Sequence, residues 1–152
     1  LAFSPDEKWL TVGGQGDSIR IFELPACDLA YEIEKVHEGY VLSLGFSPDG
    51  ARLASTGYEQ RLRFWKSGGW KLVGETQLEK QGVQALAFSP KREVIAVASD
   101  HQVTLVNAGS AEINQVISVD PKGVYCLAFS PDGQYLACGS ADKRIRLWEW
   151  PV

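Results

Sequence analysis

A repeat of about 42 residues is the feature that most constrains how this chain can fold. Four segments share one pattern, and they are LAFSPDEKWL from Leu1, LGFSPDGARLA from Leu44, LAFSPKREVIA from Leu86 and LAFSPDGQYLA from Leu127. Their phenylalanines are 43, 42 and 41 residues apart. A second pattern, IRIF, LRFW, VTLV and IRLW, keeps spacings of 43, 41 and 42 residues and ends at Phe22, Trp65, Val106 and Trp148. Since two independent landmarks keep one period, each repeat is expected to form one copy of the same small structure.

The residues within each repeat have the pattern of short β-strands, with alternating apolar residues bounded by Pro, Gly and Asp. In the second repeat, strands are predicted over Val41–Phe46, Arg52–Thr56, Arg61–Trp65 and Lys71–Thr76. The Ser-Pro-Asp-Gly sequence after the first of them predicts a tight turn, because Pro fixes φ and Gly accepts a positive φ. Fourth strands of the first and third repeats are predicted near Leu29–Val36 and Ile113–Val119. Four strands in about 40–45 residues are typical of a β-propeller blade.

The predicted fold is therefore all-β, with propeller blades of four antiparallel strands. We expect a single partial β-propeller over residues 1–152, with blades at about 1–36, 37–78, 79–119 and 120–152, the first and the last incomplete. This makes about three and a half blades, whereas closed propellers usually have about four to eight. Because open sheet edges and blade faces need cover, we expect a fragment of a longer propeller protein whose remaining blades close the ring. The alternative is that a symmetric second chain closes it.

Composition argues against several kinds of partner. The chain of 152 residues has 15 Lys and Arg against 19 Asp and Glu, a net charge of −4, so neither nucleic acid nor an anionic membrane surface is favoured. No apolar run approaches the length that spans a bilayer and no signal peptide is visible, so we expect a cytoplasmic location.

The three cysteines lack the spacings of zinc sites. We expect no metal and no cofactor.

Few residues suit catalysis. The two histidines, His37 and His101, belong to no motif that pairs a base with a nucleophile. Residues 13–16, Gly-Gly-Gln-Gly, precede a predicted strand rather than a helix, so no helix N-terminus is available for phosphate and an irregular turn is favoured. Arginines recur on the third strands, where a ladder of packed side chains is favoured over an anion site: Arg20, Arg63 and Arg146. We therefore expect a protein that is not an enzyme.

The run from Phe129 to Trp148, FSPDGQYLACGSADKRIRLW, resembles the repeat of the WD-repeat (Trp-Asp repeat) β-propeller family. The resemblance covers essentially the whole chain, although the Trp-Asp pair itself is degenerate. It implies a structural hydrogen-bond chain in the second blade, in which His37 bonds Glu59 and the hydroxyl of Ser55 or Thr56, which reaches the indole of Trp65. Other blades keep parts of this pattern, at Asp100 in the third and at Asp142 and Trp148 in the fourth.

The resemblance also implies where a partner would bind. Members of the family meet ligands with the loops that enter the innermost strand and join the second and third strands. These positions are Tyr40, Leu42, Tyr58, Gln84, Ser99, Tyr125 and Ala141. The tyrosines of the second repeat suit a peptide hot spot, since Tyr combines a rigid apolar body with a hydrogen-bonding tip. The alternative is that they only plug the mouth of the channel.

The function implied is that of a non-catalytic scaffold that binds a protein or peptide partner. The alternative is a propeller module of a TolB-like or prolyl-peptidase-like protein, which acts as a substrate gate or periplasmic interaction domain. Both kinds of propeller contain Ser-Pro-Asp-Gly turns. His37 and third strands of the IRLW type favour the WD-repeat interpretation.

Overall fold

Antiparallel sheets account for all the regular structure in the computed structural model, which describes residues 1–79, 82–119 and 123–150. The first sheet contains β1 (Ala2–Phe3), β2 (Trp9–Val12), β3 (Ile19–Glu23) and β4 (Asp28–Ile33). The second contains β5 (Val41–Phe46), β6 (Arg52–Gly57), β7 (Arg61–Lys66) and β8 (Lys71–Gln77). The third contains β9 (Ala85–Phe88), β10 (Val94–Ser99), β11 (Gln102–Asn107) and β12 (Ile113–Ser118). The fourth contains β13 (Val124–Phe129), β14 (Tyr135–Ser140) and β15 (Ile145–Glu149).

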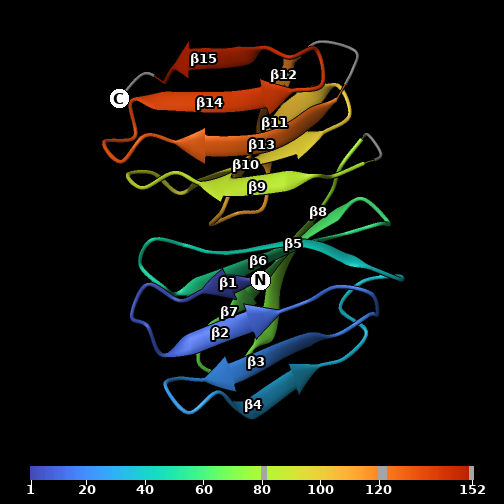
Figure 1. Cartoon of the computed structure of the whole chain (residues 1–152), viewed down its shortest axis with the longest axis vertical. Helices are drawn as coiled ribbons and strands as arrows, with labels where there is room; N and C mark the ends of the chain where they lie inside the picture. The colour runs from blue at the N-terminus through green and yellow to red at the C-terminus, as the bar shows by residue number, and fades with distance from the viewer. Residues whose placement is uncertain (80–81, 120–122, 151–152) are drawn as a thin grey trace. The chain divides into compact units, whose positions relative to one another are not determined.

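In each sheet the strands pair in the order in which they follow one another along the chain (Figure 1). This is the meander of a propeller blade, so the predicted all-β fold of blades is confirmed. The prediction of about three and a half blades agrees with a first strand of two residues and a last sheet of three strands within the described residues. The described residues contain no helix long and apolar enough to cross a membrane.

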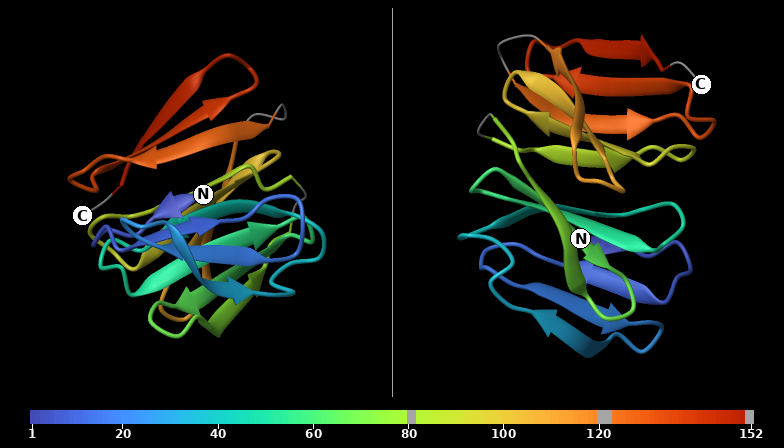
Figure 2. Two further views of the ribbon diagram at one scale, coloured as in Figure 1. Left: turned by 60° about the horizontal axis from the view of Figure 1, so that its bottom comes forward. Right: turned by 180° about the vertical axis from the view of Figure 1, so that it is seen from behind.

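The chain divides into two compact units, Leu1–Gln77 and Leu78–Val152, which we call the first and second unit. Each unit holds two sheets, and the two further views of Figure 2 show their strands from other sides. The boundary falls next to the predicted boundary between the second and third blades. That the whole chain acts as one domain stays a prediction.

The strand bounds follow the sequence pattern closely. β5 has the predicted bounds, and β6, β7 and β8 each extend one residue beyond them. β4 differs more, because it ends at Ile33 although a strand to Val36 was predicted. The reason is local: Lys35 has a φ of 54°, and the backbone N–H of Val36 donates to the carbonyl of Asp17 at 2.7 Å rather than to a strand partner.

One cross-strand register recurs in all four sheets. The pairs that join the second and third strands are Leu10–Phe22, Leu53–Trp65, Ile95–Val106 and Leu136–Trp148. Because side chains alternate between the two faces of a strand, a shared register puts equivalent side chains of every repeat on the same face of its sheet. The sequence period therefore becomes a structural period.

The Ser-Pro-Asp-Gly turns are closed by side chains. Ser47 Oγ donates to Asp49 Oδ1 at 2.6 Å, and the same Oγ accepts the backbone N–H of Arg52 at 2.9 Å. The hydroxyl bond, with the backbone N–H of Ala51, lowers the pKa of Asp49. The first and fourth sheets repeat the serine-to-aspartate bond at Ser4–Asp6 and Ser130–Asp132. In the third sheet Lys91 replaces the aspartate, so this bond is lost.

The two sheets of the first unit bury a shared apolar core. Its buried members are Ile19, Ile21, Val36, Val41, Leu44, Leu53, Trp65 and Trp70. Trp70 lies in an aromatic group where its ring meets Trp9 at a centroid distance of 6.0 Å and an interplanar angle of 88°. Such edge-to-face contacts stabilise beyond the area they bury. Trp70 thus helps hold the first sheet to the second.

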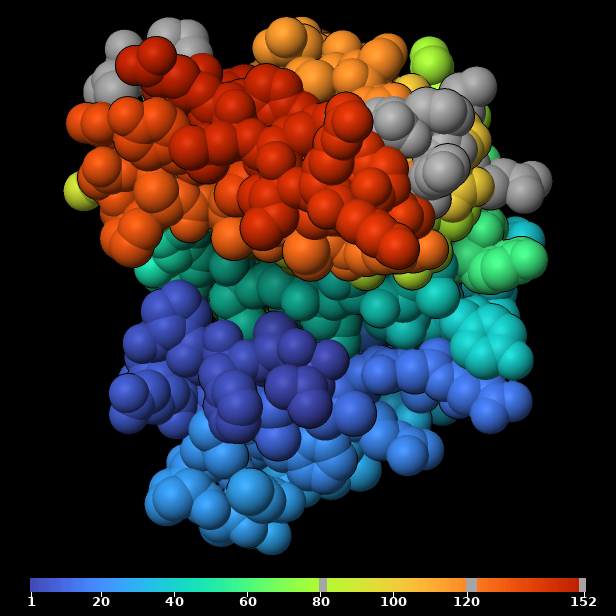
Figure 3. Space-filling view, turned by 45° about the horizontal axis from the view of Figure 1, so that its top comes forward, coloured from blue at the N-terminus to red at the C-terminus, as the bar shows by residue number. Residues whose placement is uncertain are grey.

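The second unit has its own core between its two sheets. It contains Val94, Ala96, Ala98, Val103, Leu105, Val124, Leu136 and Cys138, all buried. The innermost strands β9 and β13 lie side by side (Figure 1). β10 is buried at every residue, which explains its nearly continuous apolar sequence. By contrast, Ile145 and Leu147 of β15 are 82% and 63% exposed. Figure 3 shows the residues near the C-terminus in red at the surface of the molecule.

We expect Trp65→Ala to lower the free energy of unfolding by about 3–5 kcal/mol, because removal of a large buried ring leaves a cavity. Trp65 is only 6% exposed and belongs to the core of the first unit. Urea unfolding followed by circular dichroism measures the change. Tyr58→Ala is the control, since Tyr58 is 71% exposed and surface changes usually stay within about 0.5 kcal/mol. Equal effects of the two variants would contradict the described core.

Candidate functional site

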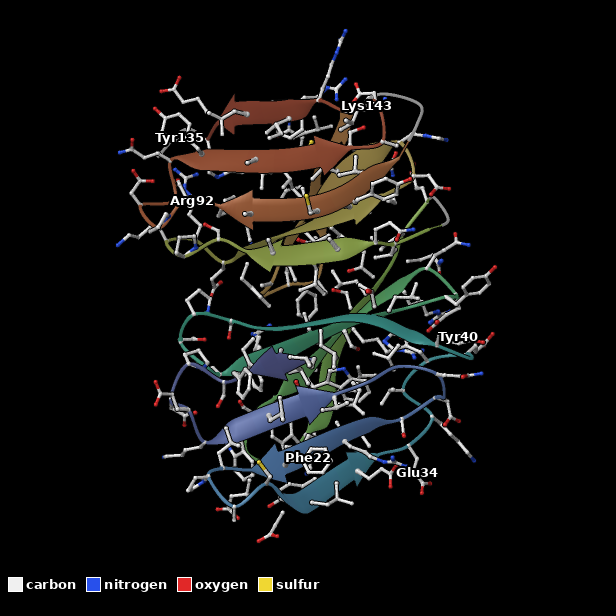
Figure 4. The ribbon with its side chains drawn as sticks, viewed as in Figure 1. Phe22, Glu34, Tyr40, Arg92, Tyr135 and Lys143 are labelled. Atoms are coloured by element: carbon white, nitrogen blue, oxygen red, sulfur yellow. The ribbon has the colours of Figure 1, made fainter. Side chains whose placement is uncertain are left out.

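Two exposed tyrosines lie together at one end of the first unit. Tyr40 precedes β5 and Tyr58 lies in the turn between β6 and β7. Their ring centroids are 6.5 Å apart at an interplanar angle of 58°, and the backbone N–H of Tyr58 donates to the carbonyl of Tyr40 at 3.2 Å. Tyr40 is 46% and Tyr58 71% exposed, and nearby Leu42 is 41% exposed. We call Tyr40, Leu42 and Tyr58 the tyrosine surface; Figure 4 labels Tyr40.

A β-bulge exposes Leu42. In the ladder between β5 and β6, Val41 pairs with Gly57 and Ser43 pairs with Thr56, so Leu42 lies between two pairs and has none of its own. A bulge of this kind bends the strand and redirects a side chain. The position of Leu42 in the repeat predicts that it is a contact residue, but the residue types around it do not predict the bulge.

The glycine segment at residues 13–16 joins the first sheet to this surface. The N–H of Gly16 donates to the carbonyl of Gly39 at 3.1 Å, and the N–H of Val41 donates to the carbonyl of Gly14 at 3.0 Å. Gly13 packs so closely on Val41 that an added Cβ would lie 2.6 Å from Val41 Cγ1. The sequence predicts an irregular turn at this segment. It is also the backbone contact that holds the entry to β5.

A buried hydrogen-bond chain lies in the same sheet. His37 Nδ1 is 2.6 Å from Glu59 Oε1, and His37 Nε2 is 2.7 Å from Ser55 Oγ. The indole N–H of Trp65 donates to Ser55 Oγ at 2.9 Å. A neutral His37 with its proton on Nδ1 satisfies this chain: it donates to Glu59 and accepts from Ser55. Thr56, the other hydroxyl that the family resemblance allows, is buried and makes no hydrogen bond to the described residues.

Burial sets the charge state of His37. The side chain is fully buried, and this desolvation lowers the pKa of His37 below its usual 6.5, although the bond to Glu59 acts in the opposite direction. Its structural role in the hydrogen-bond chain therefore explains why His37 is neutral and hydrogen-bonded at both ring nitrogens. The other histidine, His101, is exposed in the turn between β10 and β11.

Arginines of the third strands pair with carboxylates of their own sheets. Arg20 Nε lies 3.0 Å from Glu32 Oε1, and Arg63 Nε lies 3.1 Å from Glu75 Oε2. Both acids stand directly opposite their arginines on the outer strand. The bond from Arg63 lowers the pKa of Glu75, and Glu32 is shifted in the same direction by Ser18 and Arg20. That these acids pair with the arginines is visible only when the register of the strands is known.

The hydrogen-bond chain changes in the other repeats. In the fourth sheet Cys138 occupies the place of Ser55, and Asp142 instead bonds Arg146 Nη2 at 2.8 Å, which lowers the pKa of Asp142 to about 2. Trp148 is half-buried at the edge of the core. In the third sheet Val97 and Val106, both buried, replace the serine and the tryptophan. Asp100 stays near the turn, with its carboxylate against Gly82.

The remaining predicted contact residues belong to the second unit. Tyr125 is 60% exposed and occupies a bulge in β13 like that of Leu42 in β5. Gln84 is exposed, and its N–H donates to the carbonyl of Ala98 at 3.0 Å. Ala141 is half-buried. Ser99 is only 3% exposed and its hydroxyl donates to the carbonyl of Gln102 at 3.4 Å, so it adds no side chain to the surface.

The described residues contain no group of three or more His, Cys, Asp or Glu side chains that could hold a metal ion. The chemistry that the arrangement does offer is recognition: aromatic faces, hydroxyl tips and an aliphatic side chain on a backbone fixed by hydrogen bonds. The surface is therefore suited to binding a partner.

We expect the free energy of unfolding to fall as the pH drops below 6.5 toward 5. His37 has a lowered pKa in the folded protein, so below 6.5 the unfolded chain binds more protons and acid favours it. Urea unfolding at several pH values measures the slope, which should shrink in His37→Gln. The control His101→Gln should keep it, because His101 is exposed. The same slope in all three proteins would contradict a neutral, buried His37.

Comparison with known proteins extends these observations. A chain of Oryza sativa subsp. japonica named small ribosomal subunit protein RACK1y is 28% identical over 158 residues, which cover 98% of this chain and 46% of that protein. Small ribosomal subunit protein RACK1 of Schizosaccharomyces pombe is 32% identical over 126 residues, covering 74% of this chain and 38% of that protein. Target of rapamycin complex subunit LST8 of Mus musculus is 29% identical over 103 residues, covering 66% and 32%. The chain thus spans less than half the length of these relatives.

The family described as "WD domain, G-beta repeat" matches three stretches, residues 1–23, 31–66 and 113–149. Two of them combine the outer strand of one sheet with the three inner strands of the next. The first three strands of the third repeat, where Val97 and Val106 replace the serine and the tryptophan, lie outside the matches. Together the three stretches cover more than half of the residues, and this chain therefore belongs to the WD-repeat family.

Proposed function

We propose that this protein is a non-catalytic scaffold that binds a peptide or an exposed segment of a partner protein at the tyrosine surface. The observation that carries the proposal is the pair of exposed tyrosine rings, 6.5 Å apart, beside the bulged Leu42. Aromatic residues of this kind are enriched among the few side chains that dominate binding energy. The alternative role of a plug at a channel mouth is less favoured, because Tyr58 is 71% exposed.

The backbone beneath the surface is held at several points, which supports a preformed site. Tyr40 is linked to Tyr58 by a backbone hydrogen bond and pairs with Gln15 and Gly16 in the segment between β2 and β3. Glu59, next to Tyr58, is fixed by His37. A site that is ordered before binding loses less entropy when the partner arrives.

The relatives support a role in assemblies of proteins. Their names describe a small ribosomal subunit protein and a subunit of the target of rapamycin complex. We include a cytoplasmic location in the proposal, since a ribosomal protein is among them. The WD-repeat match lends no support to the alternative of a TolB-like or prolyl-peptidase-like module.

Further blades are also part of the proposal. Ile145 and Leu147 present an apolar face of the fourth sheet to solvent, and such a face is normally buried by a neighbouring repeat. The neighbour would be a blade of the same protein or a symmetric second chain. The molar mass in solution, measured by light scattering, separates a monomer from a dimer.

Selection of a peptide library on the wild-type protein tests the binding surface. We expect the combined variant Tyr40→Ala, Tyr58→Ala to bind the selected peptides at least about tenfold more weakly, because hot-spot truncations cost more than about 1–2 kcal/mol. The matched control is Tyr135→Ala, a partly exposed tyrosine on β14.

Thermal unfolding of the same variants separates the two roles of the tyrosines. Unchanged stability with weakened binding supports the proposal. Unchanged binding with lowered stability would instead identify the rings as a plug and overturn it.

A further inference from the structure

We infer that the tyrosine surface selects basic segments, with an Arg or Lys side chain as the group that it recognises. This inference rests on the proposed function and names the chemistry of the partner. It depends on the charges around Tyr40 and Tyr58, which the binding proposal itself does not use.

Three exposed acids lie at the end of the first unit that carries Tyr40. Glu38 lies two residues before Tyr40, and Asp17 follows Gly16, whose backbone pairs with Tyr40. The carbonyl of Asp17 accepts the N–H of Val36 at 2.7 Å, which holds the two loops together. Glu34 follows β4 at the same end of the unit as Tyr40, as their labels in Figure 4 show. We call Asp17, Glu34 and Glu38 the acidic rim.

The arginines at this end of the unit do not neutralise the rim, because their charges are already matched. Arg20 pairs with Glu32 at 3.0 Å, and Arg61 pairs with Glu75 at 2.7 Å. Arg63 pairs with Glu75 and with Glu59, and it also donates to the carbonyl of Val36.

The rim itself keeps an excess of negative charge. Among residues 1–79, 82–119 and 123–150, none forms an ion pair with Asp17, Glu34 or Glu38. Lys35 is the cation next to Glu34 in the sequence, so the rim together with Lys35 holds three carboxylates and one ammonium group. The whole first unit has the same sign of charge, with 11 Asp and Glu against 8 Lys and Arg. A partner of positive charge is therefore attracted to this end, and one of negative charge is repelled.

The tyrosine surface supplies what a basic side chain needs besides opposite charge. A guanidinium or ammonium group is attracted to the face of an aromatic ring. The aliphatic stem of Arg or Lys packs on apolar groups such as Leu42 while its charged end reaches solvent or a carboxylate. Exposed rings, an aliphatic neighbour and unpaired carboxylates thus occur together at one end of the unit, and an acidic or purely apolar segment would use only part of this set.

The peptides selected on the wild-type protein are the probe. Each is synthesised as selected and with every Arg and Lys replaced by Gln, and affinities are measured by fluorescence anisotropy. We expect the selected peptides to contain Arg or Lys and to bind about fivefold or more tightly than their Gln versions, since cation–π and charge terms are modest at exposed sites. Their binding should weaken when the salt concentration rises from about 0.1 to about 0.5 M, because salt screens exposed charges.

Charge-matched variants test the role of the rim. Asp17→Asn with Glu38→Gln should remove most of the preference for the basic peptide. The control Asp28→Asn with Glu23→Gln changes the net charge equally at the other end of β3 and β4, and should keep the preference. Equal losses in both variants would indicate a long-range charge effect and overturn the assignment to the rim.

The outcomes also separate this inference from the binding proposal. Selected peptides without Arg or Lys that still lose affinity in Tyr40→Ala, Tyr58→Ala would overturn the basic preference and leave the binding surface intact. Peptides that ignore the tyrosine substitutions would overturn the binding surface, and with it the inference.

Discussion

Burial of one equivalent position on the second strand, at Ser55, Val97 and Cys138, is the constraint on which the rest of the structure depends. A polar side chain at such a position is costly unless it finds hydrogen bonds inside the protein, since water does not reach it. β6 carries Ser55 on its buried length, and His37 and Trp65 satisfy it. β10 carries Val97 at the same place and needs no partner, and β14 carries Cys138. The same buried position is thus filled by a hydrogen-bonded serine, a valine or a cysteine, and the second and third strands keep the same register in each case.

The hydrogen-bond chain of His37, Ser55 and Trp65 also connects the interior to the surface. His37 precedes Tyr40 by three residues and Glu59 follows Tyr58 directly. The bond between His37 and Glu59 therefore ties the two loops that present the tyrosines. Because the ring of His37 is neutral and held at both nitrogens, the tie costs no burial of a charged imidazolium. A hydrogen bond that stabilises the fold therefore also fixes the loops of the candidate interface.

The all-β fold could be predicted from the sequence because the same strand and turn patterns recur in successive repeats. The bounds of β5 and the turn at Ser47–Gly50 follow from residue types that have strong local preferences. What the sequence could not supply depends on contacts between strands. The bulge at Leu42 and the acid opposite Arg63 require the register, and the early end of β4 requires the loop of Asp17, with which Val36 pairs.

Of the candidate contact residues, the sequence identified the exposed tyrosines by their repeat position, but it could not tell that Ser99 turns inward.

The bulges have a consequence for how such a surface can change over time. Leu42 and Tyr125 occupy equivalent bulges, and neither has a residue directly opposite it in the neighbouring strand. A substitution at either position changes the side chain offered to solvent and leaves every cross-strand pair of the ladder as it was. Recognition can therefore diversify, by natural variation or by engineering, at positions that the stability of the blades constrains only weakly.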